Sequence, residues 1–158
     1  MKDDFENLVE FEKKKHNDFF LPYYKEKGWE VLQDNIGVNA DWDVKLRIDG
    51  KDWRIDEKAR QKDYGDFLVE IVQDLKTGNR GWLFKEKDMY FYASWNNQDL
   101  LPTTFYVVYS KKLQNFVITN WKNLLPNMEI SIKGWGVTLF AKLKWEDLIF
   151  TNIAKRII

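Results

Sequence analysis

The chain has 158 residues, with 25 Lys and Arg against 25 Asp and Glu, so its formal net charge is zero. It has no cysteine and one histidine, which excludes a disulfide framework and thiolate chemistry and argues against a structural zinc site. The length suits one domain with one hydrophobic core.

The first residues carry no targeting signal. Residues 1–15 lack the basic and apolar regions of a secretory signal peptide. No apolar run approaches the roughly 20 residues that a membrane-spanning helix needs. We therefore expect a soluble cytoplasmic protein without a membrane partner.

The neutral total charge hides an asymmetry along the chain. Residues 1–79 carry 14 basic and 19 acidic residues, whereas residues 80–158 carry 11 basic and 6 acidic residues. Phosphate contacts by Lys and Arg dominate nucleic-acid affinity, so the second half is a candidate for such contacts. The alternative is that both halves simply present ordinary solvated faces.

The first predicted element is one long helix over residues 4–27, bent at Pro22. A single helical stripe runs along it and includes Phe5, Leu8, Val9, Glu12, His16, Phe19, Phe20 and Tyr23. Glu12 and His16 lie in the middle of this stripe, one turn apart. Two alternatives are that they pair with each other or that they lie beyond the core.

A short strand over residues 29–33 and then a β-hairpin follow the helix. Asp49-Gly50 separates two alternating runs, which indicates a two-residue type I′ turn because both residues tolerate positive φ. Successive side chains of a strand point to opposite faces, so Asp56 and Lys58 share one face. On the first strand of the hairpin, Asp43 lies on the face opposite Val44.

The next strand, residues 67–72, is apolar except for Glu70, and an isolated carboxylate is costly to bury without a partner, a proton or a metal. Asp43, Asp56, Lys58 and Glu70 together form a pattern. Carboxylate oxygens are the ligands of hard divalent ions, and without a cation at least one clustered acid takes up a proton. A lysine among them can hold a phosphate or position a water. This is the composition of a Mg²⁺-dependent phosphodiester hydrolysis site.

The rest of the chain predicts further strands and short helices. Strands are expected over residues 89–95, 103–109, 116–118 and 137–144. One short helix is capped by Thr119 or Asn120 and runs through Leu125, and another begins at Trp145. No linker, repeat or low-complexity tract is present, so we expect one domain over residues 1–158.

This order of elements resembles the PD-(D/E)xK nuclease superfamily, which has the restriction-endonuclease-like fold. The resemblance covers roughly residues 5–95 and rests on a helix, a strand, a strand with Asp, a hairpin and a strand with Asp-x-Lys. It matches Asp43 to the first acid, and Asp56 and Lys58 to the acid and lysine of the pair. The chain departs from the family pattern in two places. Trp42 stands where the family has Pro, and Glu57 competes with Asp56, although strand alternation favours Asp56.

The resemblance implies an α+β fold with a mixed central sheet, a long N-terminal helix, and additional C-terminal strands and short helices. It implies a Mg²⁺- or Mn²⁺-dependent deoxyribonuclease, in which Lys58 orients the attacking water and steadies the phosphate. The metal ligands would be Asp43, Asp56 and Glu70, with Glu12 added from the first helix. The expected partners are DNA and a second copy in a homodimer. Residues 20–24 and 81–83 also resemble segments of small uncharacterised phage proteins with this core.

Several alternatives stay open. The same core can persist as an inactive module that binds nucleic acid or a protein partner, or the protein can act only on a host factor. Paired carboxylates are also the catalytic residues of glycosidases, but a glycosidase mechanism gives Lys58 no role. Finally, the four charged residues can form a salt-bridge ladder on an open sheet face, where each pair is worth about 0.2–1 kcal/mol.

Overall fold

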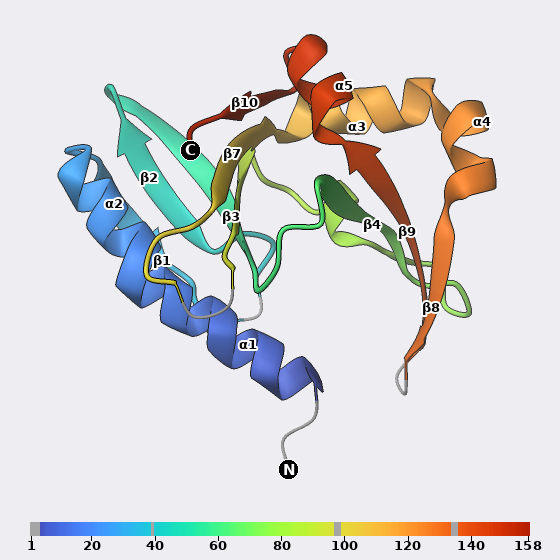
Figure 1. Cartoon of the computed structure of the whole chain (residues 1–158), viewed down its shortest axis with the longest axis horizontal. Helices are drawn as coiled ribbons and strands as arrows, with labels where there is room; N and C mark the ends of the chain where they lie inside the picture. Colours follow the sequence, from blue (N-terminus) through green and yellow to red (C-terminus); the bar gives the residue numbers. More distant parts are fainter. Residues whose placement is uncertain (1–3, 39, 97–98, 134–135) are drawn as a thin grey trace. The chain divides into compact units, whose positions relative to one another are not determined.

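The computed structural model describes residues 4–38, 40–96, 99–133 and 136–158 (Figure 1). The fold is α+β, with a mixed sheet and an N-terminal helix, which confirms the expected class. Tertiary contacts gather into two compact units where the sequence predicted one domain. Unit 1 comprises Met1–Asp63, Lys87–Val108 and Arg156–Ile158, and unit 2 comprises Tyr64–Glu86 and Tyr109–Lys155.

Unit 1 contains most of a six-stranded sheet with the order β1-β2-β3-β6-β7-β10, of which Tyr109 of β7 and the first two residues of β10 are counted in unit 2. The sheet is mixed because β1, β2 and β3 pair antiparallel, whereas β3 and β6 pair parallel. The elements are α1 (Asp4–Lys15), the π-helical turn η1 (His16–Phe20), α2 (Leu21–Glu26), β1 (Glu30–Asp34), β2 (Val44–Ile48), β3 (Lys51–Arg60), β6 (Met89–Ser94), β7 (Thr104–Tyr109) and β10 (Ala154–Arg156).

The predicted long helix is present, but a π-helical turn interrupts it at His16–Phe20. Pro22 has no backbone N–H, and its ring crowds the carbonyl four residues earlier, which a locally widened helix relieves. The wide turn also shifts the buried stripe by one residue. Tyr24, at 0% exposure, takes the fully buried position that helical periodicity predicted for Tyr23, which is half-buried.

The hairpin between β2 and β3 forms as predicted. Asp49 and Gly50 have φ values of 50° and 78°, the two positive values that a type I′ turn requires. The register pairs Ile48 with Lys51 and ends where Val44 pairs with Ile55. The alternation is confirmed in β2, where Val44 and Leu46 are fully buried and Lys45 between them is not, whereas in β3 the consecutive residues Ile55, Asp56 and Glu57 are all buried.

Beyond Ile55 the two strands separate, and this fork positions the candidate site. The ladder between β2 and β3 stops at Val44, while β3 continues to Arg60 with β6 as its partner on the other side. Asp43 stands immediately before β2, and its backbone N–H donates to the Ile55 carbonyl at 2.9 Å. The fork therefore brings Asp43 next to Asp56 and the residues that follow it.

Unit 2 contains a four-stranded sheet with the order β5-β4-β9-β8, in which each neighbouring pair is antiparallel. Its elements are β4 (Asp66–Asp74), β5 (Asn79–Arg80), η2 (Trp82–Phe84), α3 (Ser110–Thr119), α4 (Trp121–Leu124), η3 (Leu125–Asn127), β8 (Glu129–Lys133), β9 (Gly136–Lys144) and α5 (Trp145–Phe150).

Two expectations are corrected in unit 2. The run containing Glu70 is β4, which belongs to this sheet and not to the sheet of the hairpin. Residues 116–118 lie inside α3 and are not a strand. Ser110, Leu113 and Val117 are buried at helical spacing, so packing of this face overrides the β-propensity of the local sequence.

Candidate active site

Two carboxylates meet at the fork between β2 and β3. Asp43 Oδ2 accepts a hydrogen bond from the Glu57 backbone N–H at 2.7 Å, and the Asp43 side chain also hydrogen-bonds to that of Asp56. Burial and then the charge of Asp56 raise the pKa of Asp43 to about 8. At neutral pH Asp43 is therefore mostly protonated and donates to the Asp56 carboxylate.

Two ammonium groups balance the charge of Asp56. Lys58 Nζ lies 3.2 Å from Oδ1, and Lys87 Nζ lies 3.0 Å from Oδ2. Burial opposes the charge of Asp56, but Lys58 and then Lys87 outweigh it and lower the pKa of this carboxyl. The contact with Lys58 confirms that Asp56 and Lys58 share a face of β3.

Lys87 is a residue that sequence reasoning missed. It falls in a short polar stretch that predicts a turn, yet its side chain has 0% exposure. The sequence holds no local signal for it, because its place depends on the parallel register that sets Asp56 beside Tyr90 of β6. Only this long-range pairing brings Lys87 to Asp56.

The first helix contributes Glu12 to the same cluster. Burial raises the pKa of Glu12, Lys58 partly offsets that rise, and Asp56 adds to it. These electrostatic contacts place Glu12 near both members of the Asp-x-Lys pair. The alternative that Glu12 pairs with His16 is not what the structure shows, because both ring nitrogens of His16 contact other acids.

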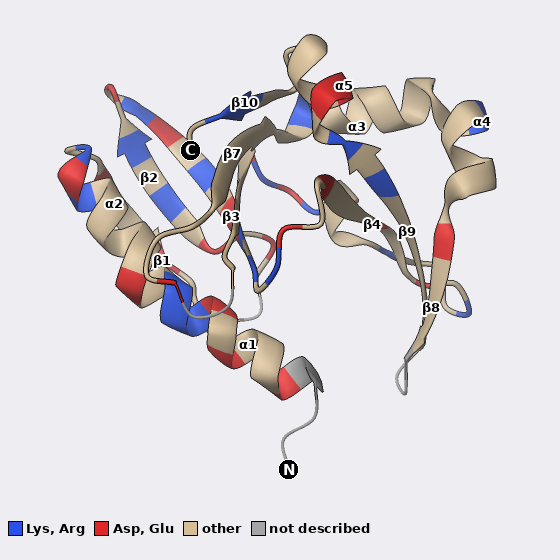
Figure 2. Ribbon diagram, in the orientation of Figure 1, with Lys and Arg blue, Asp and Glu red and all other residues tan. Residues whose placement is uncertain are grey.

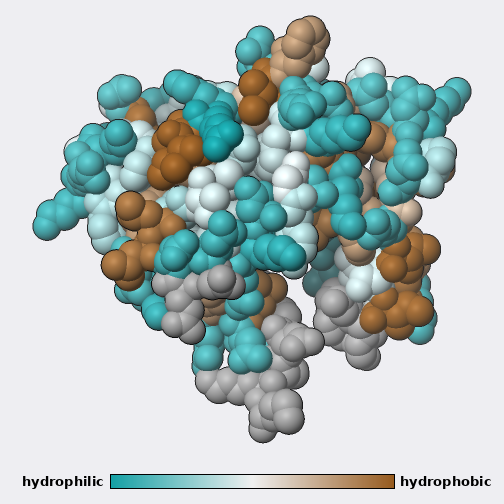
Figure 3. Space-filling view, in the orientation of Figure 1, coloured by the Kyte–Doolittle hydropathy of each residue, from teal (hydrophilic) through white to brown (hydrophobic). Residues whose placement is uncertain are grey.

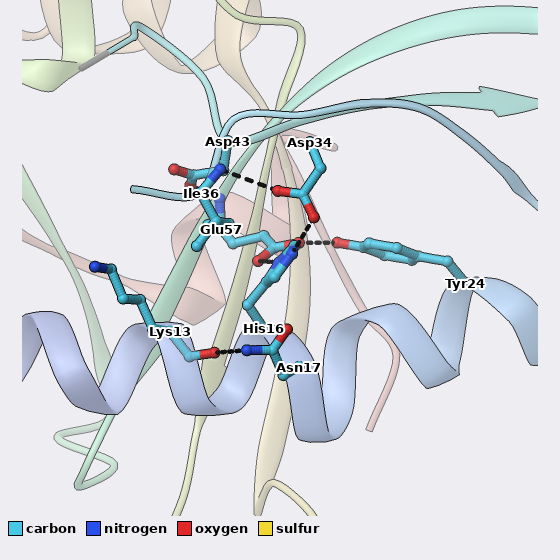
Figure 4. Close-up of polar contacts among 8 residues, drawn as sticks. All are labelled: Lys13, His16, Asn17, Tyr24, Asp34, Ile36, Asp43 and Glu57. Carbon is cyan, nitrogen blue, oxygen red and sulfur yellow. Dashed lines mark hydrogen bonds and ion pairs between the residues drawn. The ribbon is translucent and has the colours of Figure 1, made fainter. Parts of the chain in front are cut away.

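A second polar network lies around Glu57 (Figure 4). His16 Nδ1 is 2.7 Å from Glu57 Oε2, and His16 Nε2 is 2.8 Å from Asp34 Oδ2. The Tyr24 hydroxyl donates to Glu57 Oε1 at 2.6 Å. Both oxygens of Glu57 are therefore hydrogen-bonded to side chains of the N-terminal helical segment, whereas both oxygens of Asp56 contact lysines. This difference supports the choice of Asp56 as the acid of the Asp-x-Lys pair.

His16 carries a positive charge in this network. Burial opposes the charge, but the hydrogen bond and charge of Glu57, followed by those of Asp34, outweigh it and raise the pKa of His16 to about 9. The imidazolium therefore ties η1 to β3 and to β1, and it fixes the helix that carries Glu12.

The raised pKa of His16 predicts a pH dependence of stability. A histidine whose pKa rises from about 6.5 to about 9 on folding contributes fully below pH 6.5 and loses that contribution as the pH rises through 9. We expect the free energy of unfolding to fall by about 3 kcal/mol more between pH 6 and pH 9.5 in the wild type than in His16→Gln. Urea unfolding at both pH values measures this difference.

The raised pKa of Asp43 also makes the free energy of unfolding fall as the pH rises, so the effect of His16 has to be read from the difference between the wild type and His16→Gln. A carboxyl whose pKa rises to about 8 stabilises the fold below its unfolded value and stops doing so as the pH rises through 8. That contribution is common to the wild type and His16→Gln and cancels in the difference. Equal pH slopes in the two proteins would contradict the assignment of a charged His16.

Glu70 lies in unit 2. Its Oε1 accepts a hydrogen bond from the Trp82 backbone N–H at 3.2 Å. Gly81 approaches the backbone of β4 so closely that an added Cβ would lie 2.3 Å from the Glu70 carbonyl oxygen. These contacts give Glu70 a structural partner within unit 2, and its role as an acid of the Asp-x-Lys site stays a prediction.

Exposed charged residues of β1, β2 and β3 form a salt-bridge ladder of the kind that the sequence left open, but with other residues. Figure 2 marks basic and acidic positions along β2 and β3. Arg47 of β2 lies 3.0 Å from Asp52 of β3 and 3.3 Å from Glu30 of β1. These side chains are exposed, so each pair contributes little to stability. Asp56, by contrast, is 6% exposed.

The carboxylate oxygens of Asp43, Asp56 and Glu12 are of the ligand type that a hard divalent cation prefers. Within the described residues, no group of three or more His, Cys, Asp or Glu side chains is arranged to hold a metal ion. However, Asp43 and Asp56 share a proton, and such a proton is what Mg²⁺ displaces when it binds two neighbouring carboxylates. Glu12 has the oxygen ligands to complete such a set.

The comparison of the chain with protein-family models, with curated proteins and with solved structures finds no match. Of the helices in the described residues, none combines the length and the apolar character needed to cross a bilayer.

Proposed function

We propose that unit 1 is a metal-dependent nuclease of the restriction-endonuclease-like type that hydrolyses phosphodiester bonds of DNA. The observation that carries this proposal is the pair of carboxylates at the fork. Asp43 and Asp56 are held in a shared hydrogen bond, and the Lys58 ammonium group lies 3.2 Å from Asp56. Acids crowded in this way are relieved by a cation, and Lys58 adds a positive charge for a phosphate.

Asp43, Asp56 and Glu12 would hold Mg²⁺ or Mn²⁺. When bound, the ion supplies a Lewis acid for the phosphoryl oxygen and a more acidic water. Asp43 would release its proton to bind, which its pKa of about 8 allows near neutral pH.

Lys58 has the role of a fixed cation in this proposal. Burial opposes its charge, but Asp56, Glu12 and Asp43 outweigh that effect and raise the pKa of the amine. An amine that keeps its proton cannot accept one from water, so Lys58 steadies a phosphate oxygen and orients the water through its N–H groups. Lys87 is fully buried and contacts Asp56 Oδ2 at 3.0 Å, where it offsets the charge of this carboxylate.

One observation favours a second candidate, a binding module without turnover. Both oxygens of Asp56 already contact ammonium groups, and Asp43 is protonated, so these residues carry no uncompensated negative charge without a metal. Such a module would bind nucleic acid or a protein partner through unit 1. Titration of Mg²⁺ or Mn²⁺ by calorimetry distinguishes the two candidates, because only the nuclease requires the ion at these acids.

The nuclease proposal predicts loss of cleavage in Lys58→Ala. Removing one preorganised charge from a phosphoryl-transfer site is expected to lower the cleavage rate about 10²–10³-fold. The assay uses supercoiled plasmid, linear duplex and single-stranded DNA with Mg²⁺ or Mn²⁺, and EDTA as the blank. Lys51→Ala is the matched control, since Lys51 is an exposed lysine of the same strand. If the wild-type protein binds neither metal ion and cuts no substrate, the nuclease proposal is wrong and the binding module is the better description.

A further inference from the structure

The free edge of the unit 2 sheet is exposed and apolar. β8 is the last strand in the order β5-β4-β9-β8, and within the described residues it pairs with β9 alone. Ile130 is 61% exposed and Ile132 is 82% exposed. Figure 3 shows a hydrophobic area where β8 lies in Figure 1. Two neighbouring isoleucines on one face of an edge strand are a liability unless another strand covers them.

The sequence of β8 is complementary to itself when two copies run antiparallel. Glu129–Lys133 reads Glu-Ile-Ser-Ile-Lys. With Ser131 opposite its own symmetry mate, position 130 faces position 132 of the other copy. Position 129, which is acidic in the sequence, then faces position 133, which is basic. A parallel arrangement in register would set like charges opposite each other, which is unfavourable.

We propose that β8 pairs antiparallel with β8 of a second copy, about a two-fold axis at Ser131. The two sheets then form one continuous sheet through main-chain hydrogen bonds along the free edge. Four isoleucine side chains cover one another on one face, and at both ends of the ladder a position that is acidic in the sequence lies opposite a position that is basic. The occupant is a second copy because this chain itself supplies both the apolar and the charge complement.

The ion pair that Glu129 of β8 already makes within the chain is compatible with this pairing. Glu129 Oε1 lies 3.1 Å from Lys142 Nζ, and both side chains are 50% exposed. An exposed pair of this kind is weak and can be shared with a second cation. The proposed dimer interface consists of unit 2 residues only, so its test is independent of the test of the nuclease proposal.

The first test is the molar mass of the full chain by light scattering as a function of concentration. We expect the wild type to be a dimer and the double variant Ile130→Thr, Ile132→Thr to dissociate at least tenfold more readily. Threonine keeps the β-branched shape but removes apolar surface. Ile118→Thr is the matched control, because Ile118 is 60% exposed on α3 of the same unit and should leave the dimer unchanged. A monomeric wild type, or a dimer indifferent to the double variant, would overturn the proposal.

The second test reads the register. The chain has no cysteine, so Ser131→Cys introduces a single thiol. Directly opposed residues of an antiparallel pair have Cα atoms about 4.5–5.5 Å apart, a separation that a disulfide can bridge. Mild oxidation should link Ser131→Cys into covalent dimers at least tenfold faster than Ile118→Cys. Equal rates in the two variants would show that β8 does not meet its own copy in this register, whether it stays free or binds another partner.

Discussion

Asp56→Ala is expected to lower the free energy of unfolding by about 3–5 kcal/mol, although Asp56 was selected from the sequence as a catalytic acid. The substitution removes the carboxylate that the ammonium groups of Lys58 and Lys87 share. Lys87 is fully buried, so its charge cannot regain the hydration that the carboxylate replaced. Urea unfolding at pH 7 measures the effect.

A second variant identifies the cause. Adding Lys87→Met to Asp56→Ala removes the buried charge and should recover most of the lost stability. Asp52→Ala is the control, because Asp52 lies on the same strand but is exposed and should cost less than about 1 kcal/mol. A double variant no more stable than Asp56→Ala would show that Lys87 is not the source of the loss. A practical consequence is that lost activity in Asp56→Ala alone does not distinguish catalysis from folding.

Asp43→Asn separates these two effects. With its pKa near 8, Asp43 is mostly protonated in the metal-free fold, and an asparagine reproduces both of its hydrogen bonds. The amide oxygen can accept from the Glu57 N–H, and the amide N–H can donate to Asp56. Stability at pH 7 should therefore stay within about 1 kcal/mol of the wild type.

In the proposed nuclease, metal-dependent cleavage by Asp43→Asn should nevertheless fall about a thousandfold, because a neutral amide is a poor substitute for a carboxylate ligand and a bound ion would contribute several kcal/mol. Calorimetry should show weakened Mg²⁺ binding in the same variant. The Lys51→Ala protein again serves as the control for handling and purity. A variant that cuts DNA at the wild-type rate would remove Asp43 from the site.

The parts of the fold that follow from local rules were predictable. The Asp49-Gly50 turn, the alternation of β2 and the shared face of Asp56 and Lys58 each depend on a few neighbouring residues. The helical stripe was predicted with an error of one residue, because a π-helical turn cannot be seen in a regular period. Tyr24 therefore takes the buried place expected for Tyr23.

The parts that depend on pairings between distant segments were not predictable. Lys87 reaches Asp56 only through the parallel pairing of β3 with β6, 34 residues apart at Ile55 and Met89. Glu70 shows the opposite case. An acid in an apolar run predicted a metal ligand, and the sequence did not show that β4 joins another sheet, where the Trp82 backbone N–H donates to this carboxylate. A single sequence contains no signal for either pairing.

The interleaved path of the chain has a consequence for folding during synthesis. The ribosome makes Asp43, Asp56 and Lys58 early, then the Tyr64–Glu86 segment of unit 2, and only afterwards Lys87 and β6. The edge of unit 1 beside β7 forms even later, because the Ile157 N–H, near the end of the chain, donates to the Phe105 carbonyl at 2.7 Å. Such non-local closure is entropically costly and slows folding. The acids of the fork therefore stay in contact with water while the Tyr64–Glu86 segment is made, and they can become a buried cluster paired with lysines only after Lys87 and β6 have followed.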